Sequence, residues 1–141
     1  MTQYSDPQAE ALLREVALSN GFNAWLDLKL IAAGGGQCEI ECAVTDEMRQ
    51  HHGFAHGGVV GALADVATSW AGATAAGDVV TSSYTLHLFS PARGERLKAR
   101  AATIKQGKRA ATVEGRVFSV DENGAEKLVA ASLASISILQ N

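Results

Sequence analysis

One apolar segment, from about Gly57 to Ala76, constrains the fold of this chain more than any other part of its sequence. Apolar residues recur in it at the spacing of one helical face, and proline is absent, which predicts a long core-facing helix. A second face is small and polar. Glycine inside a helix costs about 0.5 to 1 kcal/mol relative to alanine, so a strand, a ligand or another helix should pack very closely there. The apolar face consists of Val59, Leu63, Val66 and Trp70, and the small stripe of Gly58, Gly61, Asp65, Ser69 and Gly72.

Asp65 is the one charged residue of this predicted helix, and Gly57-Gly58 stand at its start. The first N–H groups of a helix lack intrahelical partners and carry roughly half a positive charge, so a carbonyl oxygen or an anion can approach them. Seven residues of helix place Gly58 and Asp65 about 10 Å apart along the axis. One chain cannot easily bring both to a single reacting carbon. Two antiparallel helices related by a two-fold axis could, which predicts a dimer with two shared sites.

The rest of the chain predicts strands around that helix. Alternating apolar and polar residues, joined by short turns, indicate an antiparallel sheet whose one apolar face the long helix would cover. A shorter helix over about 7–19 should begin after Asp6 as N-cap. We expect an α+β fold, an antiparallel sheet of about six strands around one long central helix, as a single domain over 1–141. The expected strands are 26–30, 38–44, 79–89, 97–105, 110–120 and 127–139, the last with Leu128, Ala130, Ser132, Ala134, Ile136 and Ile138 on one face.

Composition restricts the function classes. With 141 residues, 47% of them apolar, and a net charge of −3, the chain is typical of one soluble globular domain, with no sign of nucleic-acid affinity. We expect no membrane-spanning run and no secretion signal, and therefore a cytoplasmic protein. Cys38 and Cys42 should be buried thiols on one strand.

The order strand, strand, helix and four strands is typical of the hotdog fold, and several motifs agree with it. His56-Gly57-Gly58 is followed by Leu63-Ala64-Asp65, then by Thr81, and the next strand ends at Ser90-Pro91-Ala92-Arg93-Gly94. Over roughly 46–138 this pattern resembles the acyl-CoA thioesterases of the PaaI type. The resemblance implies hydrolysis of a thioester to free acid and CoA, without a metal or a cofactor apart from CoA in the substrate. It also implies a homotetramer built from dimers.

The resemblance also implies roles for individual residues. Asp65 would be the nucleophile or general base, and the backbone N–H of Gly58, or that of Gly57, would polarise the thioester carbonyl. His56 would hold the loop. Gln50 stands where relatives often have asparagine, and would orient water or the carbonyl.

A hydroxyl in the strand after the helix would position the attacking water in such an enzyme. Thr81 matches that position, with Ser82 and Ser83 as neighbours within a residue or two of the same register. CoA phosphates could meet the basic turn formed by Lys105, Lys108 and Arg109, although basic residues at turns are usually only solvated.

Other interpretations stay open at this stage. A non-catalytic acyl-CoA-binding protein, or a dehydratase or hydratase, could share the same fold. Asp65 could instead pair with a cation for structural reasons. His51, His52 and His56 lack the HExxH pattern and a second ligand cluster, so no metal is expected.

Overall fold

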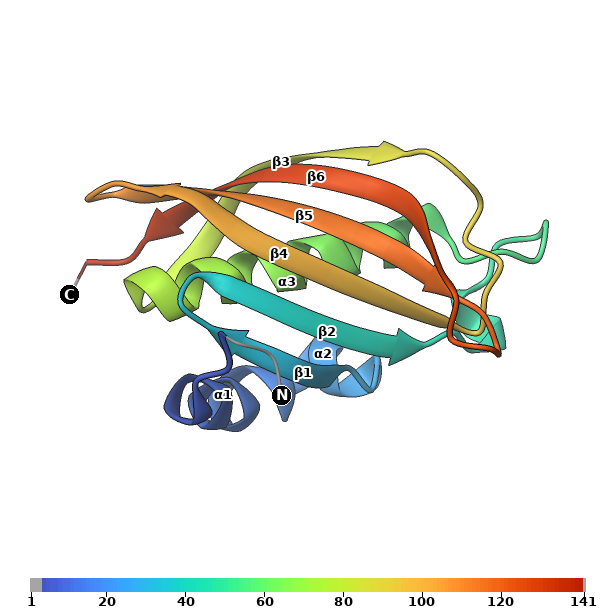
Figure 1. Ribbon diagram of the computed structural model, residues 1–141, viewed down its shortest axis with the longest axis horizontal. Helices are drawn as coiled ribbons and strands as arrows, with labels where there is room; N and C mark the ends of the chain where they lie inside the picture. Colours follow the sequence, from blue (N-terminus) through green and yellow to red (C-terminus); the bar gives the residue numbers. More distant parts are fainter. Residues whose placement is uncertain (1–3, 141) are drawn as a thin grey trace.

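A computed structural model describes residues 4–140 of the protein. A six-stranded antiparallel sheet, in the order β1-β2-β4-β5-β6-β3, curls around the long helix α3 (Gly57–Ala76), as Figure 1 shows. This confirms the predicted hotdog architecture, and the central helix begins and ends at the predicted residues. The strands are β1 (Lys29–Gly34), β2 (Gln37–Ala43), β3 (Val79–Leu88), β4 (Arg96–Gln106), β5 (Ala110–Val120) and β6 (Glu126–Ile138).

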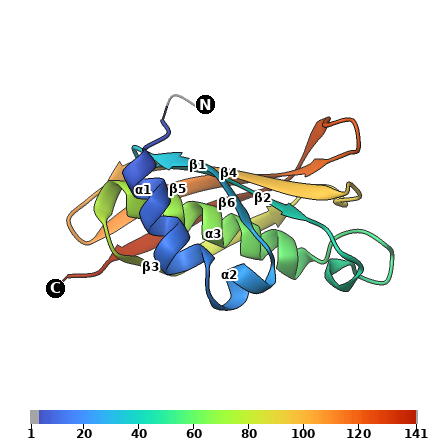
Figure 2. The ribbon, with the colours of Figure 1, turned by 90° about the horizontal axis from the view of Figure 1, so that it is seen from below.

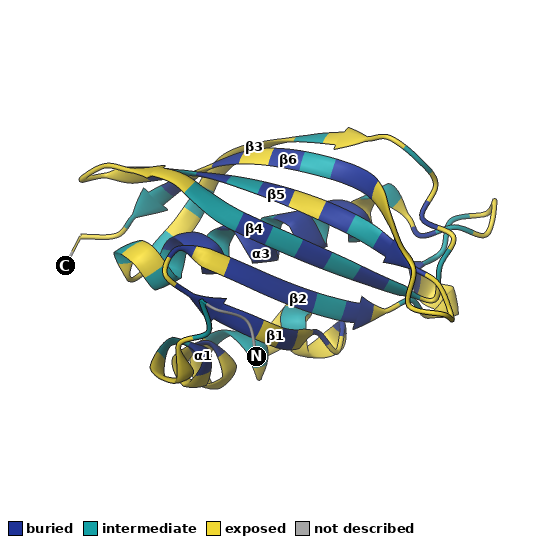
Figure 3. Ribbon diagram, in the orientation of Figure 1, coloured by how far each residue is buried: buried dark blue, intermediate teal, exposed yellow. Residues whose placement is uncertain are grey.

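The core lies between α3 and the concave face of the sheet, and α3 contacts all six strands. Buried residues alternate with more exposed ones along β4 and β5, so each strand turns one row of side chains toward the helix (Figure 3). Leu63, Val66 and Trp70 are buried as predicted, and Val60 is buried more deeply than its neighbour Val59. The helix α3 is long and apolar enough to pass a test of length and composition for a membrane span, as core helices of water-soluble proteins also do, and 56% of the tested window is buried inside this fold.

The small stripe of α3 packs against the strands at one edge of the sheet. A Cβ atom added to Gly61 would lie 3.2 Å from Leu86 of β3, and one added to Gly72 would lie 3.4 Å from Ile136 of β6. The glycines therefore allow β3 and β6 to approach the helix closely. Strands are thus the close neighbours of the stripe that the structure shows.

The N-terminal helix confirms one prediction and leads to a correction. Asp6 accepts hydrogen bonds from the backbone N–H groups of Gln8 and Ala9, and so caps α1 (Pro7–Leu13), which continues as a π-helical segment, η1 (Arg14–Leu18). The sequence pattern predicts a first strand from Leu26, but a further helix, α2 (Gly21–Trp25), precedes it and β1 begins at Lys29. Leu26 and Leu28 are buried in the connecting turn, where Asp27 has a positive φ of 55°, so their alternation with polar residues imitates a strand. Figure 2, seen from below, shows α1 and α2 in front of α3.

The predicted inner face of β6 needs one correction. Val117 pairs with Ala130 and Phe118 with Leu128, so Val129 is an extra residue in a β-bulge. The bulge shifts the alternation by one residue, and Leu128 is therefore 39% exposed while Val129 is buried. Cys38 and Cys42 are free, buried thiols, as predicted.

Candidate active site

A hydrogen bond joins the two polar residues that the sequence analysis placed at the reacting centre. The hydroxyl of Thr81 on β3 donates to Oδ1 of Asp65 on α3 over 2.7 Å. Asp65 lies in the middle of the small stripe, and both side chains are half-buried. Because β3 is an edge strand, this carboxylate lies beside the border of the sheet rather than beneath its centre. A carboxylate held in this way can act on a substrate that enters along the edge.

The start of α3 presents backbone donors. His56 is the N-cap residue, and its Nδ1 accepts a hydrogen bond of 2.8 Å from the N–H of Gly58. Within residues 4–140, the N–H of Gly57 has no hydrogen-bond acceptor. Of the two amides considered from the sequence, Gly58 is thus already engaged by His56, whereas Gly57 can still donate to a substrate atom.

The loop before α3 is tied to the segment that precedes β4. The N–H of Ala55 donates to the carbonyl of Ala92, and the N–H of His56 donates to the carbonyl of Met48 in the short 3-10 helix η2 (Asp46–Met48). The N–H of Gly94 donates to Oγ of Ser119 over 2.7 Å. These contacts fix the position of the helix start.

Gly94 closes the Pro-Ala-Arg-Gly motif, and the structure explains why glycine stands there. A Cβ atom at this position would lie 2.4 Å from the carbonyl oxygen of Val120. The motif therefore supports the site by close backbone packing, a role that the sequence alone did not indicate.

Other predicted residues take part in local contacts. Oε1 of Gln50 accepts a hydrogen bond from the backbone N–H of His52, so this side chain closes the loop ahead of α3. Oγ of Ser82 contacts Oγ of Ser137 and the carbonyl of Ser135, on the face of the sheet that points away from α3. Ser83 pairs with Ser135 beyond the irregularity in β3. Thr81 is thus the hydroxyl of this trio that reaches Asp65.

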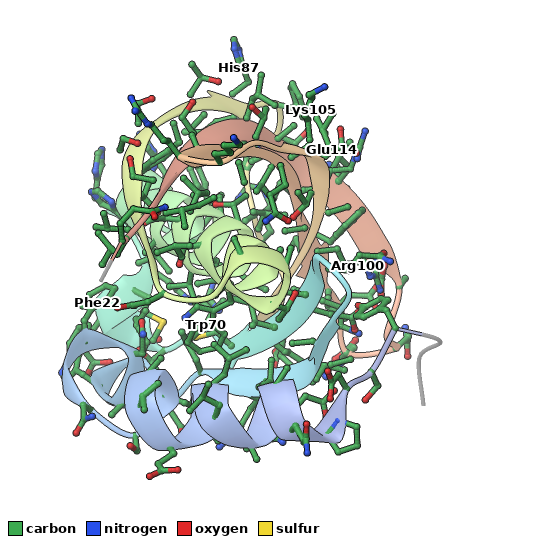
Figure 4. All side chains as sticks on the ribbon, turned by 90° about the vertical axis from the view of Figure 1, so that its left-hand side faces the viewer. Phe22, Trp70, His87, Arg100, Lys105 and Glu114 are labelled. Carbon is green, nitrogen blue, oxygen red and sulfur yellow. The ribbon has the colours of Figure 1, made fainter. Side chains whose placement is uncertain are left out.

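The basic turn between β4 and β5 lies far from the start of α3 in the same chain. In Figure 1 this turn is at the left, near the end of α3, whereas the start of α3 is at the right. The twenty residues of α3 separate the two ends by about 30 Å. Figure 4 shows Lys105 on the outer side of the sheet. A role of Lys105, Lys108 and Arg109 in phosphate binding stays a prediction.

Two hollows flank the Asp65–Thr81 pair along α3. One, of about 250 Å³, lies beside the helix start and is bordered by Gly57, Leu88 and Phe89. The other, of about 520 Å³, lies between α1 and the second half of α3. The position of α1 beside the second hollow was not predictable from the sequence, because a helical pattern does not indicate which exposed residues border a hollow.

Comparison with known proteins agrees with the fold and the motifs. The sequence model that represents the thioesterase superfamily matches residues 52–126 of this chain. A variant of the phenylacetic acid degradation protein PaaI from Thermus thermophilus is 32% identical, with a TM-score of 0.76 over 85% of this chain and 100% of that chain. A thioesterase from Haemophilus influenzae is 26% identical, with a TM-score of 0.80 over 94% of this chain and 90% of that chain.

PaaI from E. coli is 24% identical, with a TM-score of 0.79 over 96% of this chain and 93% of that chain, and supports the fold. No curated protein gives a significant match. The fold and the family define the class as a thioester hydrolase. The chain belongs to the thioesterase superfamily, among its hotdog proteins of the PaaI type.

Proposed function

We propose that the protein hydrolyses acyl-CoA thioesters to free acid and CoA, with Asp65 as the nucleophile or general base. The observation that carries this proposal is the Asp65 carboxylate, held by Thr81 beside the glycine stripe at the open edge of the sheet. A thioester is already activated toward acyl transfer. The reaction then needs a carboxylate, or a water that the carboxylate holds, and a donor for the developing oxyanion.

The N–H of Gly57 is the donor that we assign to the oxyanion. It stands at the first position of α3, where the amide and the helix dipole both favour negative charge. Eight residues separate it from Asp65, about 12 Å along one helix axis. A complete site therefore combines Asp65 of one subunit with Gly57 of its partner across a two-fold axis.

The edge strand β3 supports such a dimer. In the described part of the chain β3 pairs with β6 alone, and three of its apolar side chains, Val80, Tyr84 and Leu88, are 43–56% exposed. A long apolar edge is a template for pairing with another strand. Antiparallel pairing of two β3 strands would set the two α3 helices antiparallel, with each helix start toward the other subunit's carboxylate. The tetramer and the cytoplasmic location remain predictions.

Thiol release from acyl-CoA tests the role of the carboxylate. Asp65→Asn should abolish turnover while the oligomer, measured by light scattering, stays intact. Asp27→Asn removes an equally negative but exposed side chain in the turn between α2 and β1, and should retain full activity. Saturable CoA-ester binding without thiol release by the unaltered protein would instead indicate a non-catalytic binding protein.

The oxyanion donor has a sharp test because Gly57 is the first residue of the helix. Proline is well tolerated at this position, and His56 has the extended φ and ψ of −61° and 138° that a residue before proline needs. Gly57→Pro removes the N–H and should lower kcat by about 10² to 10³. Gly57→Ala keeps the N–H, and adds a Cβ that meets only the end of the Leu88 side chain. It should stay within about threefold of the unaltered enzyme.

Mixing the two inactive variants tests the sharing of the site. In a mixed dimer of Asp65→Asn and Gly57→Pro, one of the two sites contains an intact carboxylate and an intact amide. Random reassociation should restore about a quarter of the unaltered activity. If both groups acted within one chain, mixing would restore none.

A further inference from the structure

We propose that the hollow between α1 and α3 binds an extended aliphatic acyl chain, and that Leu12 and Val16 form its outer wall. This inference rests on the proposed thioesterase function and names the substrate class of the same site. The hollow, here called the acyl groove, has a volume of about 520 Å³, within the range of small-molecule sites. Its lining includes Leu12, Val16, Ser69, Trp70, Ala73 and Val79.

The lining of the acyl groove begins one structural repeat from the candidate carboxylate, on α3 and on β3. Ser69 follows Asp65 by one helical turn on the same face of α3. Val79 precedes Thr81 by two residues on β3 and so shares its face of the strand. Each member of the hydrogen-bonded Asp65–Thr81 pair is therefore one structural repeat from a residue that lines the groove. An acyl group whose carbonyl carbon lies at Asp65 can continue directly into it.

The shape of the groove favours a chain over a compact ring. Along α3 its lining extends from Ser69 to Gly77, which is about 12 Å of helix axis. Along the N-terminal helix its lining extends over a similar length, from Ala9 to Ala17. Trp70 lies between the two helices in Figure 4 and is 5% exposed, so it forms the floor of the groove.

The side of the groove formed by the N-terminal helical segments is apolar where it faces water, while the exposed Asp78 lies at the end of the opposite side. Leu12 is 58% exposed and Val16 is 60% exposed, one turn apart on consecutive helical segments. When an apolar ligand covers two neighbouring apolar side chains beside an elongated hollow, apolar surface leaves water and binding becomes more favourable. We assign that ligand to the acyl chain because the opposite wall is the helix that carries Asp65.

Binding of S-alkyl-CoA thioethers tests the groove without turnover. For the unaltered protein, affinity should rise about fourfold for each added methylene from ethyl to dodecyl, until the groove is filled. The double variant Leu12→Ala, Val16→Ala should bind the dodecyl compound about tenfold more weakly and the ethyl compound equally well. Ala73→Phe places a ring inside the groove, and should end the rise at a shorter chain.

Leu133→Ala is the matched control, since Leu133 is 50% exposed on the opposite face of the sheet. Its chain-length profile should equal that of the unaltered protein. An unchanged profile in both groove variants, with circular dichroism showing native folds, would overturn the proposal. Tighter binding of S-benzyl-CoA than of every alkyl compound, unaffected by the groove variants, would overturn it as well. A rising profile without hydrolysis of the matching esters would support the groove and refute the thioesterase proposal alone.

Discussion

The Thr81 hydroxyl donates to Oδ1 of Asp65 over 2.7 Å and thereby joins the edge strand β3 to the middle of α3. Removing this donor leaves the carboxylate without its fixed orientation. We expect Thr81→Val to lower kcat by about 10 to 100-fold, because a misplaced catalytic group loses the advantage of orientation. Thr81→Ser should keep most of the activity. Thr85→Val, on the exposed face of the same strand, serves as the control in steady-state assays of thiol release.

The contact of His56 with Gly58 predicts a stability effect. Because Nδ1 of His56 caps the start of α3, His56→Ala should lower the free energy of unfolding by about 1 kcal/mol. Asparagine is a good N-cap residue, so His56→Asn should recover most of that loss. Urea unfolding of the three proteins measures the difference. Equal midpoints for all three would show that the cap contributes nothing to stability.

A single methyl group added at Gly94 should destabilise the protein more than the loss of the His56 cap does. In Gly94→Ala the new methyl group would lie 2.4 Å from the backbone oxygen of Val120, which cannot move away without shifting β5. We expect a loss of about 2 to 3 kcal/mol in the free energy of unfolding. Gly107→Ala meets only an ordinary contact of 3.4 Å and should be close to neutral in the same thermal or urea measurement.

The buried thiol of Cys38 should make the free energy of unfolding depend on pH in the alkaline range. Burial, followed by the charges of Glu39 and Glu10, raises the pKa of this thiol from 9.0 to about 12. In the unfolded chain the thiol ionises above about pH 9, whereas the folded protein keeps the proton. The stabilising contribution is thus complete below about pH 9 and is lost toward about pH 12, by up to about 1.4 kcal/mol per pH unit.

Urea unfolding between about pH 8 and pH 11 should therefore show a steeper loss for the unaltered protein than for Cys38→Ala. The constant cost of the smaller side chain cancels when the slopes are compared. Parallel slopes would contradict the raised pKa. As a second readout, the folded protein should resist thiol reagents at about pH 8, and unfolding should expose both cysteines.

Long periodic segments were predictable because burial sets their pattern directly. The α3 helix and the four later strands follow from periodicity and short turns, and the glycine stripe correctly indicated a close neighbour. The β6 bulge at Val129 was not predictable, because the extra residue depends on pairing with β5. The prediction of a strand at Leu26 and Leu28 was wrong for a related reason. Both residues lie in a turn and are buried, and burial of alternate residues alone does not require a strand.

For the candidate site, the sequence indicated Asp65 and Thr81, and the structure brings them together. It could not indicate that the Gly58 amide is used by His56, because that contact depends on the side-chain rotamer of the cap. Nor could it reveal the border formed by α1, since Leu12 and Val16 resemble ordinary exposed apolar residues until the helix is placed beside α3.

The glycine stripe also limits how such a protein can diverge. Added bulk at Gly61 meets the Leu86 and Tyr84 side chains of β3, so that position cannot readily be recruited to reshape what is bound. Leu12 and Val16 face water, and exchanges there leave the core untouched. Descendants of this chain could therefore acquire new preferences through the first helix while inheriting an unaltered interior.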